Sequence, residues 1–297
     1  MTSRCGFAAI LGAPNAGKST LLNRLTGAKL SIVSPKAQTT RLRVLGVLMQ
    51  GNSQVLLVDT PGIFRPRRRL DRAMVHAAWT GAADADLVLL LVDARAGVTD
   101  PVAAIAARLA QRGGVLWLVL NKIDLVSPPR LLPLAAALGR LAPFAETFMI
   151  SAATADGVNR LLERLGEAMP EGPHLYPDDA LTDLPDRLLA AELVREQIFL
   201  QTHEEVPYGA TVETESWQER PDGSLRIEAT VYVARPGHKA ILIGERGARI
   251  RQIGARARAE LAQLLERPVH LFLNVKERAG WDEEIARLRA LGLEDPP

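Results

Sequence analysis

Residues 12–20, GAPNAGKST, carry two glycines, a lysine and a hydroxyl group at the spacing G-x-x-x-x-G-K-S. This spacing is typical of a loop that wraps around phosphates, because the glycines let backbone N–H groups point into one concavity. The helix that follows presents its positive N-terminal end to the same point. We predict that Lys18 reaches the β- and γ-phosphates of a nucleotide and that Ser19 coordinates Mg²⁺. The predicted phosphate loop consists of Gly12, Ala13, Pro14, Asn15, Ala16, Gly17, Lys18, Ser19 and Thr20.

A second motif, NKID, begins at Asn121 and indicates which base the nucleotide carries. It follows an apolar run, so it lies at the carboxyl edge of a sheet, where ligands of such folds bind. The Asp124 carboxylate accepts hydrogen bonds from N1–H and the 2-amino group of guanine, whereas adenine leaves this carboxylate unpaired. Asn121 is expected to brace the loop and Lys122 to lie along the base. A later tripeptide, SAA, is expected to close the base pocket through Ser151 and Ala152.

A third motif, DTPG, spans Asp59, Thr60, Pro61 and Gly62 and follows another apolar run. At this place a carboxylate holds Mg²⁺ through water, and the Gly62 N–H donates to a γ-phosphate until hydrolysis releases it. A loop with these contacts orders and disorders with the state of the nucleotide. The motif therefore predicts the second of two switch loops.

The first switch loop is expected in the polar stretch QTTR, residues 38–41. One threonine there must complete the Mg²⁺ shell, and we prefer Thr40 to Thr39, although the sequence leaves both open. The predicted metal ligands are thus Ser19, Thr40 and Asp59. The residue after the DTPG motif is Ile63. A glutamine at that position orients the attacking water in Ras-like enzymes, and isoleucine can neither donate nor accept a hydrogen bond.

A second glycine loop, GERG at residues 244–247, lies between two helical patterns. KH domains clamp the backbone of single-stranded nucleic acid with a G-x-x-G loop beside an apolar groove. From residue 235 to residue 258 the chain has seven Lys and Arg and only one acidic residue, Glu245. We predict RNA binding by Lys239, Gly244, Glu245, Arg246, Gly247, Arg249, Ile250 and Arg251.

The elements that position these motifs divide the chain into two parts. Short apolar runs alternate with helical patterns up to about residue 170, which predicts an α/β domain with a mostly parallel six-stranded sheet. Residues 170–186 hold four prolines and four aspartates without periodicity, which indicates a linker. A small α+β domain follows, with predicted strands Thr211–Ser216, Leu225–Val233 and Val269–Val275 and a last helix at Trp281–Leu291. The predicted strands of the first domain are Gly6–Leu11, Val44–Met49, Gln54–Asp59, Leu87–Asp93, Val115–Asn121 and Phe144–Ile150.

Charge is distributed unevenly along the 297 residues, although the formal net charge is only +2. Residues 1–170 contain 20 Lys and Arg against 11 Asp and Glu, and residues 171–297 contain 16 against 23. The basic patch around residues 235–258 is therefore local to a domain that is otherwise acidic. A single cysteine excludes an internal disulfide framework, and no apolar run approaches the ~20 residues that span a bilayer. We expect a cytoplasmic protein.

The motif spellings GxPNxGKS, QTTR and DTPG together resemble the Era family of bacterial GTPases. The resemblance extends over nearly the whole chain, through residues 176–198 and 227–233 and through VKE with Trp281. It implies a P-loop GTPase domain (residues 1–170), a linker (171–186), a type 2 KH domain (187–280) and a C-terminal helix and tail (281–297). Most members have a basic residue where Glu245 stands, so this position departs from the family pattern.

The family resemblance also implies a function and a mechanism. It implies a GTP-binding and GTP-hydrolysing switch that binds the 3′ end of small-subunit ribosomal RNA and assists assembly of the small ribosomal subunit. Several relatives use K⁺ held by the asparagine at the position of Asn15, which implies slow intrinsic hydrolysis accelerated by K⁺. The catalytic residues would be Lys18, Thr40, Gly62 and Asn15. The resemblance further implies a monomer with partial association at the inner face of the cell membrane.

Three other functions compete with this interpretation. A P-loop metabolic kinase or ATPase would lack the NKID and DTPG motifs. A second alternative is a GTPase whose C-terminal domain docks a protein. In that case Gly247→Asp should leave RNA crosslinking intact, whereas a KH domain should lose it. A membrane-remodelling GTPase would need amphipathic or transmembrane segments, and we find none in the sequence.

Overall fold

The computed structural model describes residues 2–36 and 39–295 of the chain. Its internal contacts form two compact units. Unit 1 comprises residues 1–31, 40–183 and 288–297, and unit 2 comprises residues 32–39 and 184–287. The short segment 32–39 therefore belongs with the C-terminal unit, although it interrupts the N-terminal one in sequence.

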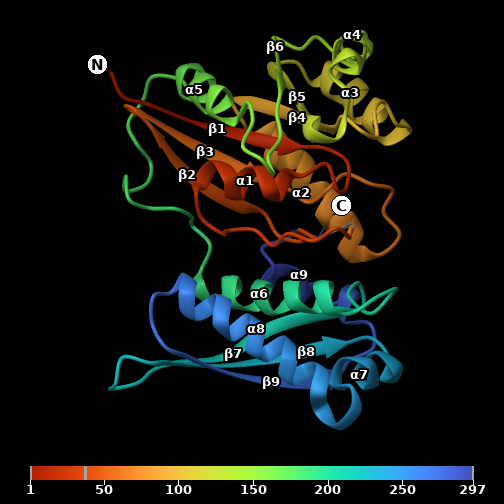
Figure 1. The fold of residues 1–297 in the computed structure, drawn as a ribbon, viewed down its shortest axis with the longest axis vertical. Helices are drawn as coiled ribbons and strands as arrows, with labels where there is room; N and C mark the ends of the chain where they lie inside the picture. The colour runs from red at the N-terminus through yellow and green to blue at the C-terminus, as the bar shows by residue number, and fades with distance from the viewer. Residues whose placement is uncertain (1, 37–38, 296–297) are drawn as a thin grey trace. The chain divides into compact units, whose positions relative to one another are not determined.

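Unit 1 is built on a six-stranded sheet with the order β2-β3-β1-β4-β5-β6 (Figure 1). Of these six strands, only β2 and β3 pair antiparallel, and they form a hairpin around Gly51 and Asn52. The inner strands are uninterrupted apolar runs because both faces of a parallel sheet are covered. The strands are β1 (Arg4–Leu11), β2 (Val44–Gln50), β3 (Ser53–Asp59), β4 (Leu87–Asp93), β5 (Val115–Asn121) and β6 (Glu146–Met149).

Five helices cover the two faces of this sheet. Apolar residues of α2, α3 and α4 form one core with β1, β4 and β5, and α1 and α5 contact β2 and β3 on the other face (Figure 1). The mostly parallel α/β fold predicted for this part is confirmed. The helices are α1 (Lys18–Thr26), α2 (Arg69–Ala83), α3 (Asp100–Arg112), α4 (Leu131–Gly139) and α5 (Val158–Ala168).

The segment predicted as a linker has no helix or strand of its own, but hydrogen bonds hold it against the hairpin of unit 1. The buried Gln54 side chain donates to Tyr176 O at 2.8 Å and accepts from Leu175 N at 2.9 Å. Val47 N donates to Leu181 O at 2.9 Å. Residues 175–182 therefore run along the hairpin of β2 and β3 and are hydrogen-bonded to it.

Unit 2 is a three-stranded sheet covered by helices on one face. β8 (Leu225–Val233) is central, antiparallel to β7 (Ala210–Glu219) and parallel to β9 (Val269–Glu277). Apolar residues of α6 (Asp186–Gln201), α7 (Pro236–Ile243) and α8 (Ala248–Leu264) form one core with this sheet. The chain order of helix, two strands, two helices and a strand agrees with the predicted small α+β domain.

Several element boundaries differ from the sequence prediction, for example in β6, which is Glu146–Met149 where Phe144–Ile150 is predicted. The predicted strand 211–216 extends to Glu219, because a bulge between Thr214 and Ser216 lets the ladder with β8 continue. The predicted helix from residue 281 to residue 291 is divided. A 3₁₀ turn at Trp281–Glu283 is separated from α9 (Ile285–Ala290), because Glu284 is extended with ψ 118°. The indole of Trp281 is buried and donates to Gly209 O at 3.1 Å, which fixes this turn.

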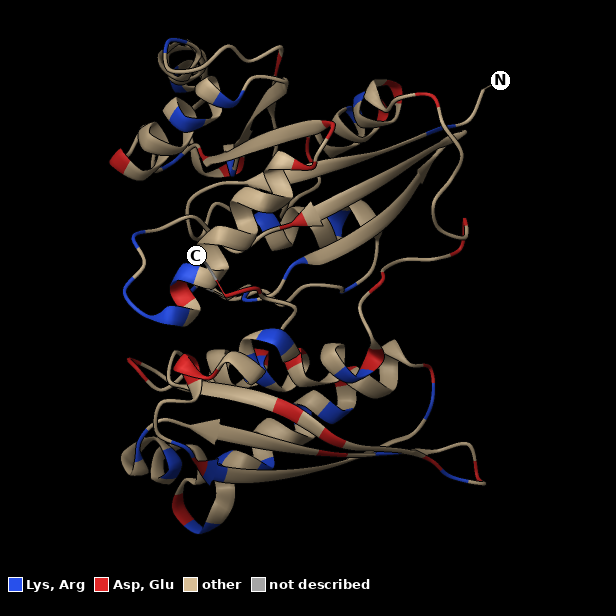
Figure 2. Cartoon of the chain, turned by 180° about the vertical axis from the view of Figure 1, so that it is seen from behind, with Lys and Arg blue, Asp and Glu red and all other residues tan. Residues whose placement is uncertain are grey.

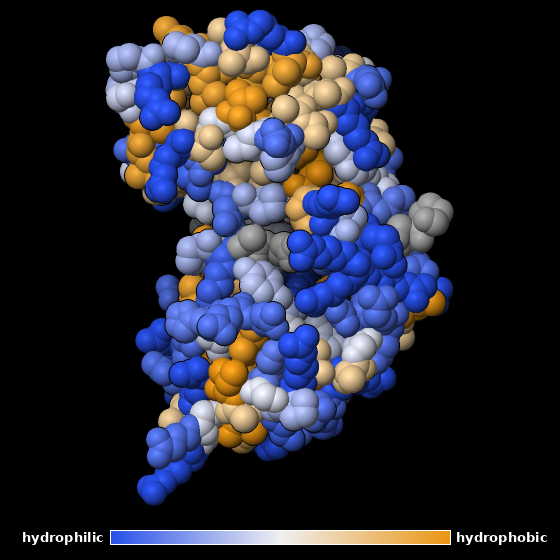
Figure 3. All heavy atoms as spheres, turned by 90° about the vertical axis from the view of Figure 1, so that its right-hand side faces the viewer, coloured by the Kyte–Doolittle hydropathy of each residue, from blue (hydrophilic) through white to orange (hydrophobic). Residues whose placement is uncertain are grey.

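An apolar area lies on the face of unit 1 that Figure 3 shows. Leu125 and Leu132 are 53% and 72% exposed, and hydrophobic side chains gather over the region of α3 and α4 at the top of Figure 3. Within the described ranges, no helix has the length and apolar content needed to cross a bilayer.

Candidate functional site

The predicted phosphate loop lies between β1 and α1, and its shape depends on glycine. Gly17 has φ 99°, and a Cβ atom there would lie 2.3 Å from Asn121 Nδ2. A Cβ atom on Gly12 would lie 2.4 Å from Leu91 O. No side chain caps the first turn of α1 and no acidic residue lies in it. The backbone N–H groups of this turn are therefore suited to an anion.

The Lys18 ammonium folds back over the phosphate loop. Its Nζ donates to Gly12 O at 3.3 Å and to Ala13 O at 3.2 Å. Burial lowers the pKa of Lys18 to about 8, and the nearby Asp59 carboxylate opposes this shift. A phosphate group would favour the charged ammonium at this place. The Lys18 ammonium therefore lies at the phosphate loop, and its contact with a phosphate stays a prediction.

Four oxygen-bearing side chains converge beside the loop. Ser19 Oγ lies 2.7 Å from Thr40 Oγ1 and donates to Asp59 Oδ2 at 2.8 Å. Ser31 Oγ donates to the same Asp59 oxygen at 3.0 Å. Asp59 is fully buried, its pKa is raised chiefly by burial, and its Oδ1 has no hydrogen-bond partner among the described residues. A buried carboxylate among hydroxyl oxygens fits Mg²⁺, which prefers hard oxygen ligands.

The two candidate threonines of the first switch are distinguished by their contacts. Thr40 Oγ1 faces Ser19 and Asp59, whereas Thr39 Oγ1 donates to Lys36 O at 2.8 Å. The sequence argument missed Ser31, whose backbone N–H is held by Asn23 Oδ1 at 2.9 Å. No local sequence motif marks this serine, because its contact with Asp59 is made across the fold. Gln38 of the predicted switch stretch lies outside the described residues.

The base-reading motif is tied to the phosphate loop through Asn121. Its Nδ2 donates to Ala16 O at 2.8 Å, and its Oδ1 accepts from Ala152 N at 3.0 Å. The bracing role predicted for Asn121 is therefore present in the structure. Lys122 Nζ donates to Asn15 O at 2.6 Å and pairs with Asp93 at 2.7 Å. These contacts leave Asp124 exposed at the rim of the sheet.

The second switch motif lies directly against the phosphate loop. A Cβ atom on Gly62 would lie 3.1 Å from Pro14 Cα, and Ile63 N donates to Gly12 O at 3.1 Å. The Thr60 hydroxyl donates to Ile10 O at 2.9 Å and is fully buried. The Thr60 side chain therefore braces β1.

The second glycine loop has the backbone that its glycines predict. Gly244 and Gly247 have φ 70° and φ 75°, and Arg246 between them also has a positive φ of 50°. Glu245, Arg246 and Arg249 are exposed. Figure 2 shows Lys and Arg in blue along α8 and around this loop. The backbone of the loop is therefore open to a partner, and the flanking charges are mainly positive.

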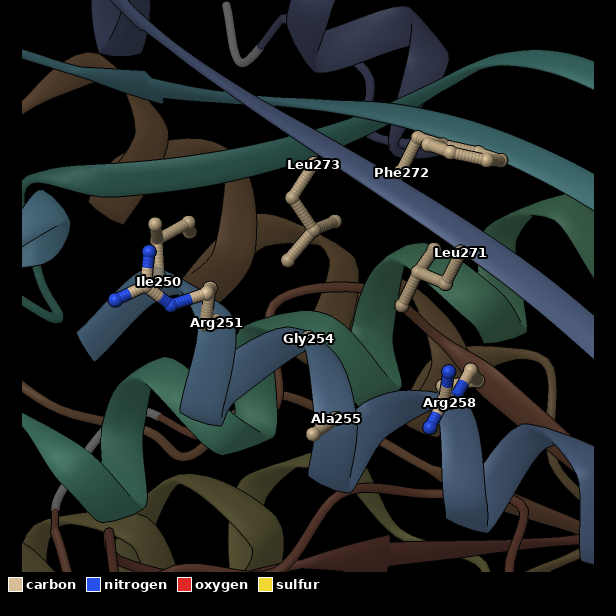
Figure 4. Close-up of a pocket in the computed structure, with 8 residues that line it drawn as sticks. All are labelled: Ile250, Arg251, Gly254, Ala255, Arg258, Leu271, Phe272 and Leu273. Atoms are coloured by element: carbon tan, nitrogen blue, oxygen red, sulfur yellow. The ribbon is translucent and has the colours of Figure 1, made fainter. Parts of the chain in front are cut away.

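A groove of about 380 Å³ runs beside this loop, between α8 and β9 (Figure 4). A Cβ atom on Gly254 would lie 3.4 Å from Leu273 Cδ1, so the small residue sets the close approach of helix and strand. Leu271 and Leu273 point toward α8, whereas Phe272 points away from it (Figure 4). Of the lining residues, the sequence predicted only Ile250 and Arg251. The others are Gly254, Ala255, Arg258, Leu271, Phe272 and Leu273.

The sequence could have suggested half of these missed residues. Gly254, Ala255 and Arg258 lie one helical turn or two beyond Ile250 and Arg251 on the same predicted helix. The β9 residues carry no such signal, because their place beside α8 depends on the parallel pairing of β9 with β8.

Two family models match parts of this chain. Residues 7–122 match a model described as 50S ribosome-binding GTPase, and residues 205–282 match a model described as KH domain. The first match contains the phosphate loop and both switch motifs, and the second contains the glycine loop and the groove.

Relatives and solved structures align with nearly the whole chain. GTPase Era of Afipia carboxidovorans is 53% identical over 99% of this chain and 96% of its own length. GTPase Era of Bradyrhizobium diazoefficiens is 52% identical with the same coverage. A crystal structure of an Aquifex aeolicus Era variant bound to GDP·AlF4⁻ is 39% identical, with a TM-score of 0.93 over 97% of this chain and 99% of that one.

A second crystal structure shows Era in complex with MgGDPNP and nucleotides 1506–1542 of 16S ribosomal RNA. It is 39% identical to this chain, with a TM-score of 0.94 over 98% of this chain and 99% of the other. The likeness includes both units and not the GTPase fold alone. With its phosphate loop, base-reading motif and KH unit in one sequence, this chain belongs to the Era family of GTPases.

Proposed function

We propose that this protein is a GTP-controlled switch that binds the 3′ end of small-subunit ribosomal RNA and assists assembly of the small ribosomal subunit. The observation that carries the proposal is the combination of an oxygen-lined phosphate site in unit 1 with a glycine loop and basic groove in unit 2. The relative of known structure that holds MgGDPNP and 16S ribosomal RNA supports it.

Guanine recognition would depend on Asp124. Its carboxylate would accept from N1–H and the 2-amino group, while Asn121 keeps the loop in register through its bonds to Ala16 and Ala152. Lys122 would lie along the base, because its ammonium is already held at Asn15 O and Asp93. Two charge-assisted hydrogen bonds discriminate strongly against a base that cannot make them.

Magnesium would be held by the three predicted ligands, Ser19, Thr40 and Asp59. Their side-chain oxygens already converge, and the unpaired Asp59 Oδ1 is the acceptor that a hydrated cation would satisfy through water. When bound, Mg²⁺ would supply positive charge that stabilises the phosphates. Lys18 would add the second positive charge at these phosphates, and the Gly62 N–H would contact the γ-phosphate.

Intrinsic hydrolysis is proposed to be slow, because Ile63 stands where a glutamine would orient water. Ile63 is also buried, 8% exposed, and its N–H is occupied by Gly12 O. We propose that K⁺ bound near Asn15 compensates by adding charge where negative charge develops in the transition state. Asn15 has a positive φ of 63°, which places it at a sharp bend of the phosphate loop.

RNA binding would use the backbone of Gly244 and Gly247 for phosphates and the groove along α8 for bases. Arg251 and Arg258 lie on its helical side. Because Glu245 is exposed at the clamp, it would repel phosphate and weaken binding relative to a basic residue. The remaining proposed RNA contacts are Lys239, Arg246, Arg249 and Ile250.

Two binding measurements on the purified protein test the proposed function. GTP and ATP should be compared as competitors for a fluorescent GDP analogue, and GTP should win by orders of magnitude. RNA from the 3′ end of small-subunit ribosomal RNA should be titrated into protein loaded with GDP or with a non-hydrolysable GTP analogue. A preference for adenine nucleotides would overturn the nucleotide assignment, and equal RNA affinities in both states would remove the switch.

The family resemblance also supports a monomer that works in the cytoplasm and associates in part with the inner face of the membrane. Sedimentation of the pure protein and fractionation of cells that produce it test these two points separately.

A further inference from the structure

One hydroxyl group on Asp59 comes from a residue outside the predicted metal ligands. Asp59 Oδ2 accepts from Ser19 Oγ at 2.8 Å and lies 3.5 Å from Thr40 Oγ1. The third hydroxyl is that of Ser31, whose Oγ donates to the same oxygen at 3.0 Å. Ser19 and Thr40 are proposed to hold Mg²⁺, whereas Ser31 has no proposed contact with the metal or the nucleotide. The Ser31 hydroxyl therefore serves the carboxylate and not the cation.

Ser31 is itself held in place by the side chain of Asn23. Asn23 Nδ2 donates to Ser31 O at 2.6 Å, and Asn23 Oδ1 accepts from Ser31 N at 2.9 Å and from Leu30 N at 3.0 Å. Ser31 is 4% exposed and lies in irregular chain after α1, so its backbone groups need partners from outside a helix or a strand ladder. A side-chain amide offers both the donor and the acceptor that such a residue needs. The position of Ser31 is thus fixed from α1.

Helix α1 reaches the Asp59 carboxylate by two routes. Ser19 and Asn23 are four residues apart, so their side chains leave the helix on the same face. Ser19 contacts the carboxylate directly, and Asn23 reaches it through Ser31. Asp59 ends β3, is fully buried, and has no hydrogen-bond partner for Oδ1 among the described residues. Because the hydroxyl donors all lie at Oδ2, they orient the carboxylate so that Oδ1 is the oxygen left for a ligand.

We propose that Ser31 is a positioning residue for Asp59 and that Asn23 holds Ser31 in its place. Asn23, Ser31 and Asp59 all belong to unit 1. The hydrogen bond from Ser31 restrains rotation of the carboxylate, which keeps Oδ1 directed at the place of a hydrated cation. The inference rests on the proposed role of Asp59 in holding Mg²⁺, and it adds to that role two residues that do not touch the metal.

Three variants of the full-length protein test the positioning role. Ser31→Ala removes the hydroxyl and keeps the backbone that Asn23 holds. Asn23→Ala removes the three hydrogen bonds to residues 30 and 31. Ser53→Ala is the matched control, because Ser53 is also buried, at 8% exposed, and begins the strand that Asp59 ends. None of these substitutions removes a predicted phosphate, metal or base contact.

The first readout is the affinity for a fluorescent GDP analogue, measured at saturating Mg²⁺ and again in excess EDTA. The ratio of the two affinities reports the coupling between metal and nucleotide. Ser31→Ala should bind about tenfold more weakly in Mg²⁺, because partners that orient a metal ligand contribute at least this much. Its affinity in EDTA should equal that of the parent protein, and Ser53→Ala should match the parent in both conditions. A fall of equal size in Mg²⁺ and in EDTA, or no fall in either, would overturn the positioning role.

The second readout is the melting temperature of the nucleotide-free protein in EDTA, which separates positioning from a merely structural role. Asn23→Ala should melt at a lower temperature, because buried backbone groups lose their partners. Ser31→Ala should melt close to the parent protein. A melting temperature of Ser31→Ala that falls as far as that of Asn23→Ala would make the hydroxyl structural and contradict the proposal.

The double variant Asn23→Ala/Ser31→Ala tests whether the two residues act along one route. Because Asn23 is proposed to act through Ser31, the double variant should lose no more Mg²⁺-dependent affinity than Asn23→Ala alone. Additive losses would remove Asn23 from the proposal. A parent protein that binds no guanine nucleotide would refute the proposed function itself. A parent that binds GDP, with Ser31→Ala unchanged in Mg²⁺, would refute only the positioning role.

Discussion

Lys122 Nζ donates to Asn15 O at 2.6 Å and so joins the loop that reads the base to the loop that surrounds the phosphates. Asn121 makes a second connection through Ala16 O. Because both bonds reach backbone carbonyls, they fix the path of the phosphate loop independently of its side chains. The loops proposed to recognise the base and the phosphates are therefore joined by one set of hydrogen bonds.

Exchange of the Asp124 carboxylate for an amide should change base specificity. Asp124→Asn replaces one of the two carboxylate acceptors with an NH2 donor that faces the 2-amino group of guanine, so GTP affinity should fall about 100-fold. The amide N–H of asparagine matches the 2-oxo group of xanthine, so xanthosine triphosphate should bind better than GTP. Competition binding measures both effects, and Asp84→Asn is the control for loss of an exposed carboxylate. Retention of guanine preference in Asp124→Asn would contradict the assignment.

A methyl group at position 17 should disrupt the contact between the phosphate loop and Asn121. Gly17→Ala places Cβ at 2.3 Å from Asn121 Nδ2, whereas Gly27→Ala, at a similar positive φ, meets nothing within 4 Å. Gly27→Ala should cost only about 1 kcal/mol of unfolding free energy from backbone strain. Gly17→Ala should cost about 3 kcal/mol, because a buried hydrogen bond is also lost, and GDP binding should be lost with it. Urea unfolding of both variants makes the comparison, and equal costs would show that the contact with Asn121 is unimportant.

The two threonines of the first switch should differ in their effect on metal dependence. Thr40→Ala removes the hydroxyl that faces Ser19, so the Mg²⁺ requirement of GTP hydrolysis should rise at least about tenfold. Thr39→Ala removes only a hydroxyl bond to Lys36 O, and the carbonyl held by Arg195 remains. Its metal requirement should stay close to that of the parent protein. The reverse order would assign the ligand to Thr39.

Potassium should accelerate hydrolysis in a way that depends on Asn15. Single-turnover GTP hydrolysis in KCl should be faster than in NaCl at equal ionic strength, by about tenfold or more. Asn15→Ala should lose this difference while keeping the NaCl rate. Equal rates of the parent protein in the two salts would remove K⁺ from the mechanism.

Reversal of the acidic charge in the glycine loop should strengthen RNA binding. Glu245→Lys replaces a repulsive charge with an attractive one at the clamp, so affinity should rise several-fold and the slope of log K against log salt should steepen by about 1. Glu277→Lys makes the same change of net charge at an exposed position at the end of β9 and serves as the control. An equal gain in both variants would indicate general electrostatics without a clamp at Glu245.

Some residues of the two units could be identified from the sequence, and others could not. Gly12, Gly17, Asn121 and Gly244 were identified from sequence because each performs a backbone or edge-of-strand role that only its own residue type and neighbours decide. The strand and helix order of both units followed from apolar periodicity for the same local reason. The extended Glu284 that interrupts the last predicted helix was missed, because the burial of Trp281 against Gly209 O is a long-range contact.

By itself, the sequence determined the two folds, the nucleotide motifs and the second glycine loop. Each of these depends on the residue types and their spacing within a short stretch of the chain. Only the tertiary structure decided that Ser31 shares Asp59 with Ser19 and that β9 lines the groove. Such pairs lie far apart along the chain and have no period or motif in common, so packing alone brings them together.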